Sequence, residues 1–539
     1  FTSGSDTEVI LKAYLEWGEQ SLQQFIGMFA FVIYDKTADK LFIARDRAGV
    51  KPLFYYFKDD NLLFASELKA LFVHPSFKKE IDGQSVVDFL RYGNIPAPAS
   101  IFQNTFKLEP GHYMTVDLKT KHITTNKYWN VLDYYSQDKL KISEAEATAE
   151  LKQRLEKACA YRMVSDVPVG LFLSGGYDSS LVAALLQSQT SSRIKTFTIG
   201  FSDAAFNEAH YAKQVADHLG TDHHELYCSY DDAKSIIPEL PDHYDEPFGD
   251  SSAIPTILVS RFARKSVTVA LSADGGDELM AGYERHAALL GLATKVKKLQ
   301  PFTRKILGGG IKYAPPFVLK MFGKGDNTSK ENLGKYADFL KGKTDLVDLI
   351  DLANQTALPS EIQALLTGVT KTREVFDKTA IRKLPSAMDQ LLAFDYISYL
   401  PNDILAKVDR ATMSVSLEGR EPLLDQNLIE WIARLPDTFK LNNGKTKYLF
   451  REIVHSYIPK SIMDRPKMGF AIPLTDWFRK DLRMIFETYL NDKALGRHGF
   501  FKPAEVAQLL DGYYRGENFR FPLLWNILMF QLWYEKWME

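Results

Sequence analysis

The segment Val167-Pro-Val-Gly-Leu-Phe-Leu-Ser-Gly-Gly-Tyr-Asp-Ser-Ser180 is the most informative stretch of this 539-residue chain. Its apolar first half is typical of a buried strand, and its polar second half leads into a helical pattern over residues 178–189. Glycines let backbone N–H groups approach an anion, and the start of a helix attracts negative charge. We therefore predict a phosphate-binding turn, although a Ser/Gly turn capped by Asp178 without any ligand would share this pattern. No lysine follows the glycines, so the segment is not a GxxxxGKS/T loop.

Strand and helix patterns alternate on both sides of this turn. They indicate helices at residues 144–162, 178–189 and 207–219 and strands at residues 167–173, 195–201 and 224–228. Such alternation predicts a parallel sheet with right-handed crossovers. From about residue 285 onward the pattern is nearly all helical, as at residues 387–400 and 526–538.

The first part of the chain has a different, β-rich pattern. After one helix over residues 7–17, short strands are indicated at residues 27–34, 40–45, 51–56 and 62–66. Residues 93–111 hold three prolines between two glycines, which favours extended loop. We therefore predict two domains, residues 1–135 and residues 136–539, in a multidomain α/β protein.

Composition narrows the class of protein. A hydrophobic content of 45%, a charged content of 25% and a net charge of −2 are ordinary for a soluble globular protein and argue against a nucleic-acid partner. No run approaches the roughly 20 apolar residues that cross a bilayer. Cys159 and Cys228 are the only cysteines, which excludes a disulfide framework and a cysteine metal site. We expect a cytoplasmic enzyme, with the basic stretch at residues 295–312 as solvated surface.

Two further clusters complement the glycine turn. Leu271-Ser-Ala-Asp-Gly-Gly-Asp-Glu278 supplies carboxylates, and Asn443-Gly-Lys-Thr-Lys-Tyr448 supplies lysine. Carboxylate oxygens suit Mg²⁺, and lysine suits phosphate charge. Together the three clusters indicate nucleotide chemistry with a metal ion. Helix capping by Asp178 and Asp277, and a surface location for Lys447, are the alternatives.

Ser174-Gly-Gly-Tyr-Asp-Ser179 resembles the SGGxDS loop of the ATP pyrophosphatases. Further motifs narrow the resemblance to the glutamine-hydrolysing asparagine synthetases: Asp274-Gly-Gly-Asp-Glu278 with Gly282-Tyr283, Val408-Asp-Arg-Ala-Thr-Met413, Glu418-Gly-Arg-Glu-Pro-Leu-Leu-Asp425 and Lys467-Met-Gly-Phe470. The resemblance covers essentially the whole chain. It implies an incomplete αββα glutaminase domain of the N-terminal-nucleophile type, followed by a parallel-sheet α/β ATP pyrophosphatase domain, similar to adenine nucleotide alpha hydrolases, with a helical C-terminal part.

The resemblance also implies a reaction and its site. An aspartate carboxylate attacks ATP to give β-aspartyl-AMP and pyrophosphate, and ammonia then yields asparagine and AMP. Asp178 and Asp277 would hold Mg²⁺, Lys447 would stabilise charge on phosphorus, and Asp274 would act on ammonia or only position it. The matching ATP-binding positions are Phe172, Leu173, Ser174, Gly175, Gly176, Asp178, Ser179, Ile199, Ser272 and Ala273.

The acceptor side departs from part of the family. Arg410, Glu418 and Arg420 match acceptor-binding positions, with salt bridges between helices as the alternative. Where some relatives carry a Thr-Thr-Ile-Arg run, this chain has Glu246-Pro-Phe-Gly-Asp-Ser-Ser252. Aspartate is the expected acceptor. Because guanidinium is the natural clamp for a carboxylate and this segment lacks the arginine, the alternative is a sugar acid, peptide or antibiotic precursor.

The first domain resembles only the later part of the family's glutaminase. The family nucleophile is an N-terminal cysteine, which is not in this sequence, whereas Asp6 matches the residue that binds the glutamine amino group. Capping of the first helix by Asp6 is compatible with that role. We expect that this sequence is truncated at its N-terminus and that the nucleophilic cysteine lies upstream. The alternative is a natural form that has lost glutaminase activity. As written it would use free ammonia. The expected partners are aspartate, ATP, glutamine or ammonia and a second copy in a homodimer, with no nucleic acid and no membrane.

Three other functions share parts of this pattern. A tRNA-modifying enzyme with the same loop is disfavoured by the near-neutral charge. A metal-dependent hydrolase built on Asp222-His-His-Glu225 would have adjacent histidines on opposite faces of one strand. A binding or scaffold protein is disfavoured because Asp178, Asp277 and Lys447 are all present.

Overall fold

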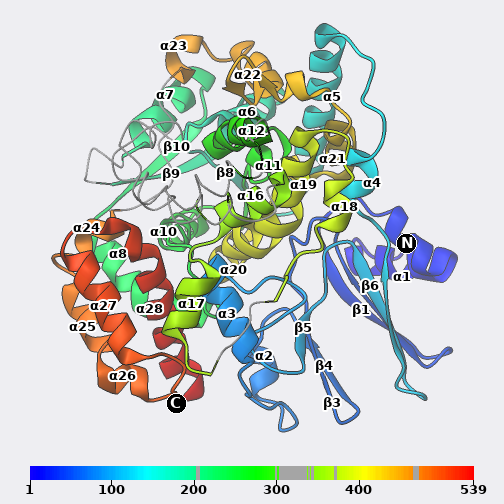
Figure 1. The fold of residues 1–539 in the computed structure, drawn as a ribbon. Helices are drawn as coiled ribbons and strands as arrows, with labels where there is room; N and C mark the ends of the chain where they lie inside the picture. Colours follow the sequence, from blue (N-terminus) through cyan, green and yellow to red (C-terminus); the bar gives the residue numbers. More distant parts are fainter. Residues whose placement is uncertain are drawn as a thin grey trace.

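The computed structural model describes residues 1–201, 207–297, 345–368, 373–464 and 473–539, together with residues 300, 302, 337 and 340. The Lys467–Phe470 motif and most of the basic stretch at residues 295–312 lie outside the described residues. Figure 1 shows a β-rich part near the N-terminus beside a larger part in which helices surround a sheet.

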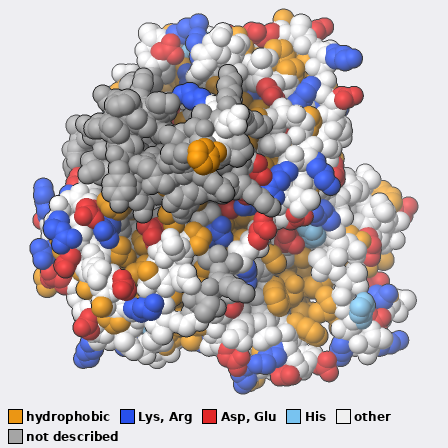
Figure 2. Space-filling view, viewed as in Figure 1, with side chains coloured by type: hydrophobic (Ala, Val, Ile, Leu, Met, Phe, Trp, Pro, Cys, Tyr) orange, Lys and Arg blue, Asp and Glu red, His pale blue; other side chains and the backbone are white. Residues whose placement is uncertain are grey.

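The N-terminal part contains two antiparallel sheets. The first has the order β1-β2-β6-β7 and the second the order β4-β3-β5. Their strands are β1 (Ala30–Asp35), β2 (Lys40–Arg45), β3 (Phe54–Lys58), β4 (Asn61–Ala65), β5 (Thr105–Lys107), β6 (His112–Asp117) and β7 (Ile123–Lys127). The helices of this part are α1 (Asp6–Trp17), the 3₁₀ turn η1 (Gly18–Gln23), α2 (Lys69–Phe72) and α3 (Gly83–Tyr92). Figure 2 shows hydrophobic side chains gathered in a hollow where Figure 1 draws β3 to β6.

Most of the predicted strands in this part are confirmed, with shifts that have local causes. The strand at residues 40–45 matches β2 at both ends. The strand expected at residues 51–56 begins only at Phe54, because Pro52 offers no N–H to a neighbouring strand. The helix expected at residues 7–17 begins one residue earlier. Its N-cap is Ser5, whose hydroxyl accepts a hydrogen bond from the Thr7 N–H, so capping by Asp6 is wrong.

The second part is built on a five-stranded parallel sheet with the order β10-β9-β8-β11-β12. The strands are β8 (Val169–Phe172), β9 (Lys195–Phe201), β10 (Asp222–Cys228), β11 (Val269–Leu271) and β12 (Glu418–Arg420). The chain leaves β8 toward β9 on one side and returns as β11 on the other. Ligands bind where the strand order reverses in this way, beyond the carboxyl ends of the strands.

Helices cover both faces of this sheet (Figure 1). They include α5 (Glu144–Met163), α6 (Tyr177–Ser188), α7 (Ala209–Leu219), α10 (Ala253–Arg264), α20 (Leu405–Met413) and α22 (Tyr448–His455). The capping box of Ser143 and Glu146 starts α5, as the predicted boundary at residue 144 requires. Helix α6 is buried from Ser179 to Leu186, so it forms a central support beneath the glycine turn.

A π-helical segment interrupts the longest helical run among the described residues. Helix α19 (Ala387–Tyr399) continues through Leu400–Ile404 in π geometry into α20. Pro401 lies inside the segment and offers no N–H for the regular α-helical ladder. The Asn402 side chain compensates, because it donates to the Ser398 carbonyl at 2.7 Å.

The remaining helices lie mainly in the C-terminal part. They are α4 (Val131–Tyr135), α8 (Tyr230–Ile236), α9 (Leu240–His243), α11 (Gly276–Leu279), α12 (Glu284–Lys297), α16 (Leu346–Asn354), α17 (Pro359–Leu365), α18 (Thr379–Arg382), α21 (Gln426–Ala433), α23 (Lys460–Met463), α24 (Leu474–Trp477), α25 (Arg483–Tyr489), α26 (Asp492–Gly496), α27 (Pro503–Tyr514) and α28 (Phe521–Met538). No helix in the described ranges combines the length and apolarity of a membrane-spanning segment.

The two parts share a hydrophobic cluster around α3 and α28. Phe102 packs against Trp533 with ring centroids 5.7 Å apart, and Phe72 packs against Trp537 at 5.1 Å. The Trp533 indole donates to the Asp245 carbonyl at 2.7 Å. The topology changes near residue 135, but the two parts of the chain still pack against each other through this shared cluster.

Candidate active site

The first glycine turn follows β8 at the carboxyl edge of the parallel sheet. Gly175 adopts φ +72°, and a Cβ there would lie 2.7 Å from the Ala212 backbone nitrogen, so only glycine fits. Gly176 is the N-cap of α6 and has no side chain to occupy the free N–H groups of the first helical turn. The hydroxyls of Ser174 and Ser179 lie 3.0 Å apart across the turn. The turn therefore presents backbone and hydroxyl donors to an anion.

The second glycine turn follows β11, the neighbouring strand. Gly275 adopts φ +94° and starts the short helix α11, which carries Asp277. A Cβ on Gly276 would lie 2.5 Å from the Asp178 carboxyl carbon. The missing side chain at Gly276 thus lets Asp178 and Asp277 approach each other from two different strand ends.

Lys447 joins these two carboxylates from a third element. It is the N-cap of α22 and adopts a left-handed conformation with φ +54°, which is uncommon for a residue with a side chain. Its Nζ lies 2.7 Å from Asp277 Oδ1 and also contacts Asp178. Burial alone would lower the pKa of Lys447, but the two carboxylates raise it above its ordinary value. Lys447 therefore stays cationic.

The same two carboxylates fit a magnesium ion. Both converge on one cation, the Lys447 ammonium, and carboxylate oxygens are the ligands that Mg²⁺ prefers. The Asp178 carboxyl group fills the place that a side chain at position 276 would take. Asp178 and Asp277 are thus the residues that could hold the ion together with phosphate oxygens.

These groups line one cavity of about 620 Å³. The structure brings together in its lining every position that the sequence assigns to ATP, metal or catalysis: Phe172, Leu173, Ser174, Gly175, Gly176, Asp178, Ser179, Ile199, Ser272, Ala273, Asp274, Asp277 and Lys447. Burial raises the pKa of Asp274, against the opposing effects of Lys407 and of the Ser272 hydroxyl, which donates to Asp274 at 2.5 Å.

The lining also holds residues that the sequence did not single out. Lys407 donates to Asp250 at 2.9 Å and to the Ser252 hydroxyl at 2.9 Å. Glu278 accepts a hydrogen bond from Tyr283 at 2.7 Å, and burial followed by the charge of Asp277 raises the pKa of Glu278 to about 8. The sequence pointed to Lys407 and Asp250 only through their positions. Lys407 directly precedes the Val408–Met413 motif, and Asp250 lies in the segment at residues 246–252, which has no arginine.

The residues expected to bind the acceptor lie elsewhere. Arg410, Glu418 and Arg420 do not occur among the described residues that line the 620 Å³ cavity. Arg420 Nε donates to Glu418 at 2.7 Å within strand β12, and its NH1 donates to the carbonyl of Val164 at 2.7 Å. Arg420 therefore forms an ion pair within strand β12 and a hydrogen bond to the end of α5. It does not form a salt bridge between helices in the described part of the chain.

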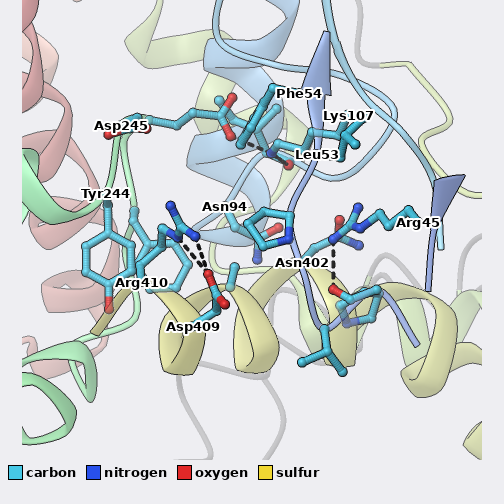
Figure 3. Close-up of a pocket in the computed structure, with 18 of the residues that line it drawn as sticks. Arg45, Leu53, Phe54, Asn94, Lys107, Tyr244, Asp245, Asn402, Asp409 and Arg410 are labelled. Carbon is cyan, nitrogen blue, oxygen red and sulfur yellow. Dashed lines mark hydrogen bonds and ion pairs between the residues drawn. The ribbon is translucent and has the colours of Figure 1, made fainter. Parts of the chain in front are cut away.

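Arg410 borders a second cavity of about 80 Å³ between the two parts of the chain. Figure 3 shows the Arg410 guanidinium turned toward Asp409 on one side of this space and Arg45 on the opposite side. Arg410 also pairs with Glu67 at 2.8 Å, and Lys51 pairs with Asp409 at 3.4 Å. Arg410 thus ties α20 to the N-terminal part.

Neither cysteine has the environment of a nucleophile. Cys159 lies in α5 and Cys228 at the end of β10, and burial raises the pKa of each thiol to about 12. Among the described residues there is no group of three or more His, Cys, Asp and Glu side chains placed to hold a metal ion by themselves. His223 meets Thr196 at 2.9 Å, whereas His224 stacks on Phe197, so the pair faces opposite sides of β10.

Comparison with known proteins agrees with this geometry. A family model described as asparagine synthase matches residues 150–535, and one described as a glutamine amidotransferase domain matches residues 1–129. The chain is 29% identical to glutamine-hydrolyzing asparagine synthetase 1 of Bacillus subtilis, over 99% of this chain and 81% of that protein. It is 37% identical to a putative asparagine synthetase of Methanocaldococcus jannaschii, over 76% of this chain and 77% of that protein. A putative asparagine synthetase of Mycobacterium tuberculosis is 30% identical, over 100% of this chain and 81% of that protein. The chain therefore belongs to the asparagine synthase family.

Proposed function

We propose that this protein is a ligase that makes asparagine from aspartate, ATP and ammonia through β-aspartyl-AMP. The observation that carries the proposal is the meeting of Asp178, Asp277 and Lys447 between two glycine turns in one cavity. The family membership supports ATP and the amide product.

The proposed first step is attack by a carboxylate oxygen of the acceptor on the α-phosphorus of ATP. The new O–P bond forms as the bond to pyrophosphate breaks. Backbone and hydroxyl donors of Ser174–Ser179 hold the phosphates, and the Lys447 ammonium stabilises the negative charge that builds on them. Mg²⁺ bound by Asp178 and Asp277 would neutralise the leaving pyrophosphate.

The proposed second step is attack by ammonia on the acyl carbon of the adenylate. The C–N bond forms, the C–O bond to AMP breaks, and nitrogen gives up a proton. Asp274 is the proposed acceptor of that proton, because it is a buried carboxylate between Lys407 and Asp277. A purely positioning role for Asp274 is the alternative.

The source of ammonia belongs to the N-terminal part. We propose that glutamine supplies the ammonia, with Asp6 binding the glutamine amino group. The cavity of about 80 Å³ lies between the two parts, next to Arg45 and Arg410. Assembly as a homodimer stays a prediction.

A second acceptor class is favoured by one observation. The segment at residues 246–252 offers Asp250, Ser251 and Ser252 to the cavity, and none of these is a cation. Among the described lining residues the one arginine is Arg451, which stacks on the Tyr177 ring at 4.1 Å. Amidation of a carboxylate other than aspartate is therefore the second candidate.

The test is an assay of all products with the purified chain. With ATP, Mg²⁺, ammonium and aspartate labelled with ¹⁸O in its side-chain carboxylate, we expect equal amounts of asparagine, AMP and pyrophosphate, with one label in AMP. Release of ADP and phosphate, or unlabelled AMP, would overturn the adenylate mechanism. A panel of other carboxylic acids in the same assay separates the two acceptor classes.

A further inference from the structure

A lysine and an aspartate form a second charged centre in the 620 Å³ cavity, apart from the Lys447 cluster. Lys407 comes from α20 and Asp250 from the loop before α10, two helices that pack against each other. Asp274, in the second glycine turn, interacts electrostatically with both Lys407 and Asp277, and it lines the same cavity as Lys407 and Asp250, so the pair and this turn share one cavity. The pair therefore borders the place where an acceptor carboxylate must enter.

The pair is rigidly built. Lys407 is 9% exposed, and its Nζ is held by Asp250 and by the Ser252 hydroxyl, each at 2.9 Å. The Ser252 hydroxyl in turn donates to Asp250 at 2.7 Å, and the Ser252 N–H donates to the same carboxylate at 2.9 Å. Behind them, burial and the charge of Asp250 raise the pKa of Asp403, so Asp250 is the ionised member of that acid pair.

A cavity-lining ion pair of this kind matches a ligand that carries both charges. An ammonium group can take the place of Lys407 at Asp250, while a carboxylate takes the place of Asp250 at Lys407, so no charge is left unpaired. A bare dicarboxylate would instead place a second anion against Asp250 and Asp274. The pair thus favours a zwitterionic head group over a dianion.

From the cavity and these contacts we infer that Asp250 and Lys407 bind the ammonium and the non-reacting carboxylate of an amino-acid acceptor, and that Ser252 positions both. The inference rests on the proposed function. The segment at residues 246–252 has no arginine to bind the acceptor's carboxylate. The inference assigns that contact to Lys407, which lies on a different element, α20. The acceptor class is an α-amino acid whose side-chain carboxylate reaches the ATP phosphates.

Two truncated acceptors separate the two contacts. 3-Aminopropanoate keeps the reacting carboxylate and the amine of aspartate but lacks its α-carboxylate, and succinate keeps both carboxylates but lacks the amine. Pyrophosphate release is measured with each acceptor for the full chain and for the variants Lys407→Met, Lys407→Arg, Asp250→Asn and Ser252→Ala.

We expect Lys407→Met to raise KM for aspartate by about 10- to 100-fold, the worth of a charge-assisted hydrogen bond, with KM for ATP within about twofold. Because 3-aminopropanoate has no carboxylate for Lys407 to bind, its kcat/KM should change far less than that for aspartate, and Lys407→Arg should restore part of the aspartate affinity. Asp250→Asn should weaken aspartate and 3-aminopropanoate but leave succinate unchanged. Ser252→Ala removes only a hydroxyl and should raise KM for aspartate by about 3- to 10-fold.

The outcomes keep the inference and the proposed function apart. If the unmodified chain releases no pyrophosphate with any acceptor, the proposed function fails. If it is active, but Lys407→Met affects aspartate and 3-aminopropanoate equally or neither, the inference is overturned. A Lys407→Met chain that does not fold leaves Lys407→Arg and Ser252→Ala to decide, and an unchanged aspartate KM in both would overturn it. Preference of the unmodified chain for succinate over aspartate would do the same.

Discussion

The Nζ atom of Lys447 lies 2.7 Å from Oδ1 of Asp277, although one residue starts α22 and the other lies in α11. The Asp178 carboxylate at the start of α6 contacts the same ammonium. Three helix starts therefore meet at one charge cluster. This geometry concentrates positive ends of helices and one lysine where phosphate charge is expected to develop.

Replacing Lys447 by methionine should abolish adenylation without unfolding the chain. We expect pyrophosphate release to fall by at least about 100-fold, because the donor to the developing charge is lost. Lys447→Arg keeps the charge but not the shape and should recover only part of the rate. The comparison is made with saturating ATP and aspartate, and a Lys447→Met rate within threefold of the original would contradict the assigned role.

Gly282 should be intolerant of any side chain. A Cβ there would overlap the Lys447 Cε atom and the Asp277 carboxylate. Since displacement of a catalytic group by about 1 Å can reduce a rate about 100-fold, Gly282→Ala should lose most of its activity. Gly291→Ala in α12 is the matched control, because nothing lies within 4 Å of its added Cβ, and it should stabilise the helix by about 0.5–1 kcal/mol. Equal activities of the two variants would show that the overlap is relieved elsewhere.

Arg420 should matter for stability and not for acceptor affinity. Its guanidinium donates to the carbonyls of Arg162 and Val164 and pairs with Glu418, away from the nucleotide cavity. Arg420→Met should therefore lower the free energy of unfolding by about 1–2 kcal/mol in a denaturant titration. KM for aspartate should stay within twofold of the original value. A larger rise would indicate that Arg420 contributes to acceptor binding.

Lys440 makes stability depend on pH. Its side chain is 0% exposed, and burial followed by the charge of Lys139 lowers the pKa of Lys440 to about 7. The unfolded chain therefore binds more protons between pH 7 and pH 10.5, and this contribution to stability is present above pH 10.5 and is lost as the pH falls toward 7.

Lys440→Met removes that penalty. The variant should be more stable than the original chain at pH 6, and the difference should shrink by on the order of 2 kcal/mol at pH 9. Lys139→Met should instead destabilise the chain at pH 9, because it removes the partner of the buried Asp389 at 2.5 Å and leaves Lys440 at 3.9 Å. It should also weaken the pH dependence, because burial then lowers the pKa of Lys440 without the added effect of the Lys139 charge. A difference in unfolding free energy that stays constant from pH 6 to pH 9 would show that Lys440 does not titrate in this range.

Local chemistry explains what the sequence could predict. The strand at residues 195–201 matches β9 at both ends because six of its seven residues are buried. The glycine turns were predictable because Gly175 and Gly275 adopt positive φ, which is a local property, whereas the contacts that exclude a side chain there come from the distant Ala212 and Leu424. The assignment of the neighbouring positions to ATP stays a prediction.

Contacts between distant elements explain what the sequence could not predict. The pair of Lys407 and Asp250 exists only because α10 packs against α20, and no periodicity in either helix signals it. The π segment at Leu400–Ile404 is also hidden, because apolar spacing continues through Pro401. The direction of the Arg420 side chain was hidden as well, because a charged residue near a motif gives no direction for its side chain, and its role toward the acceptor stays a prediction.

The hydrophobic cluster between α3 and α28 limits how such a protein can evolve. Phe102 from the first part and Trp533 from the last helix are each about 1% exposed, and they pack against each other within one cluster that spans both parts. A chain divided near residue 135 would uncover this surface on both fragments, so neither half would be an independent catalyst. Under the proposed function, exchange of the N-terminal part for a foreign one would succeed only with a donor whose surface already complements α28, which would tie the inheritance of the two parts together.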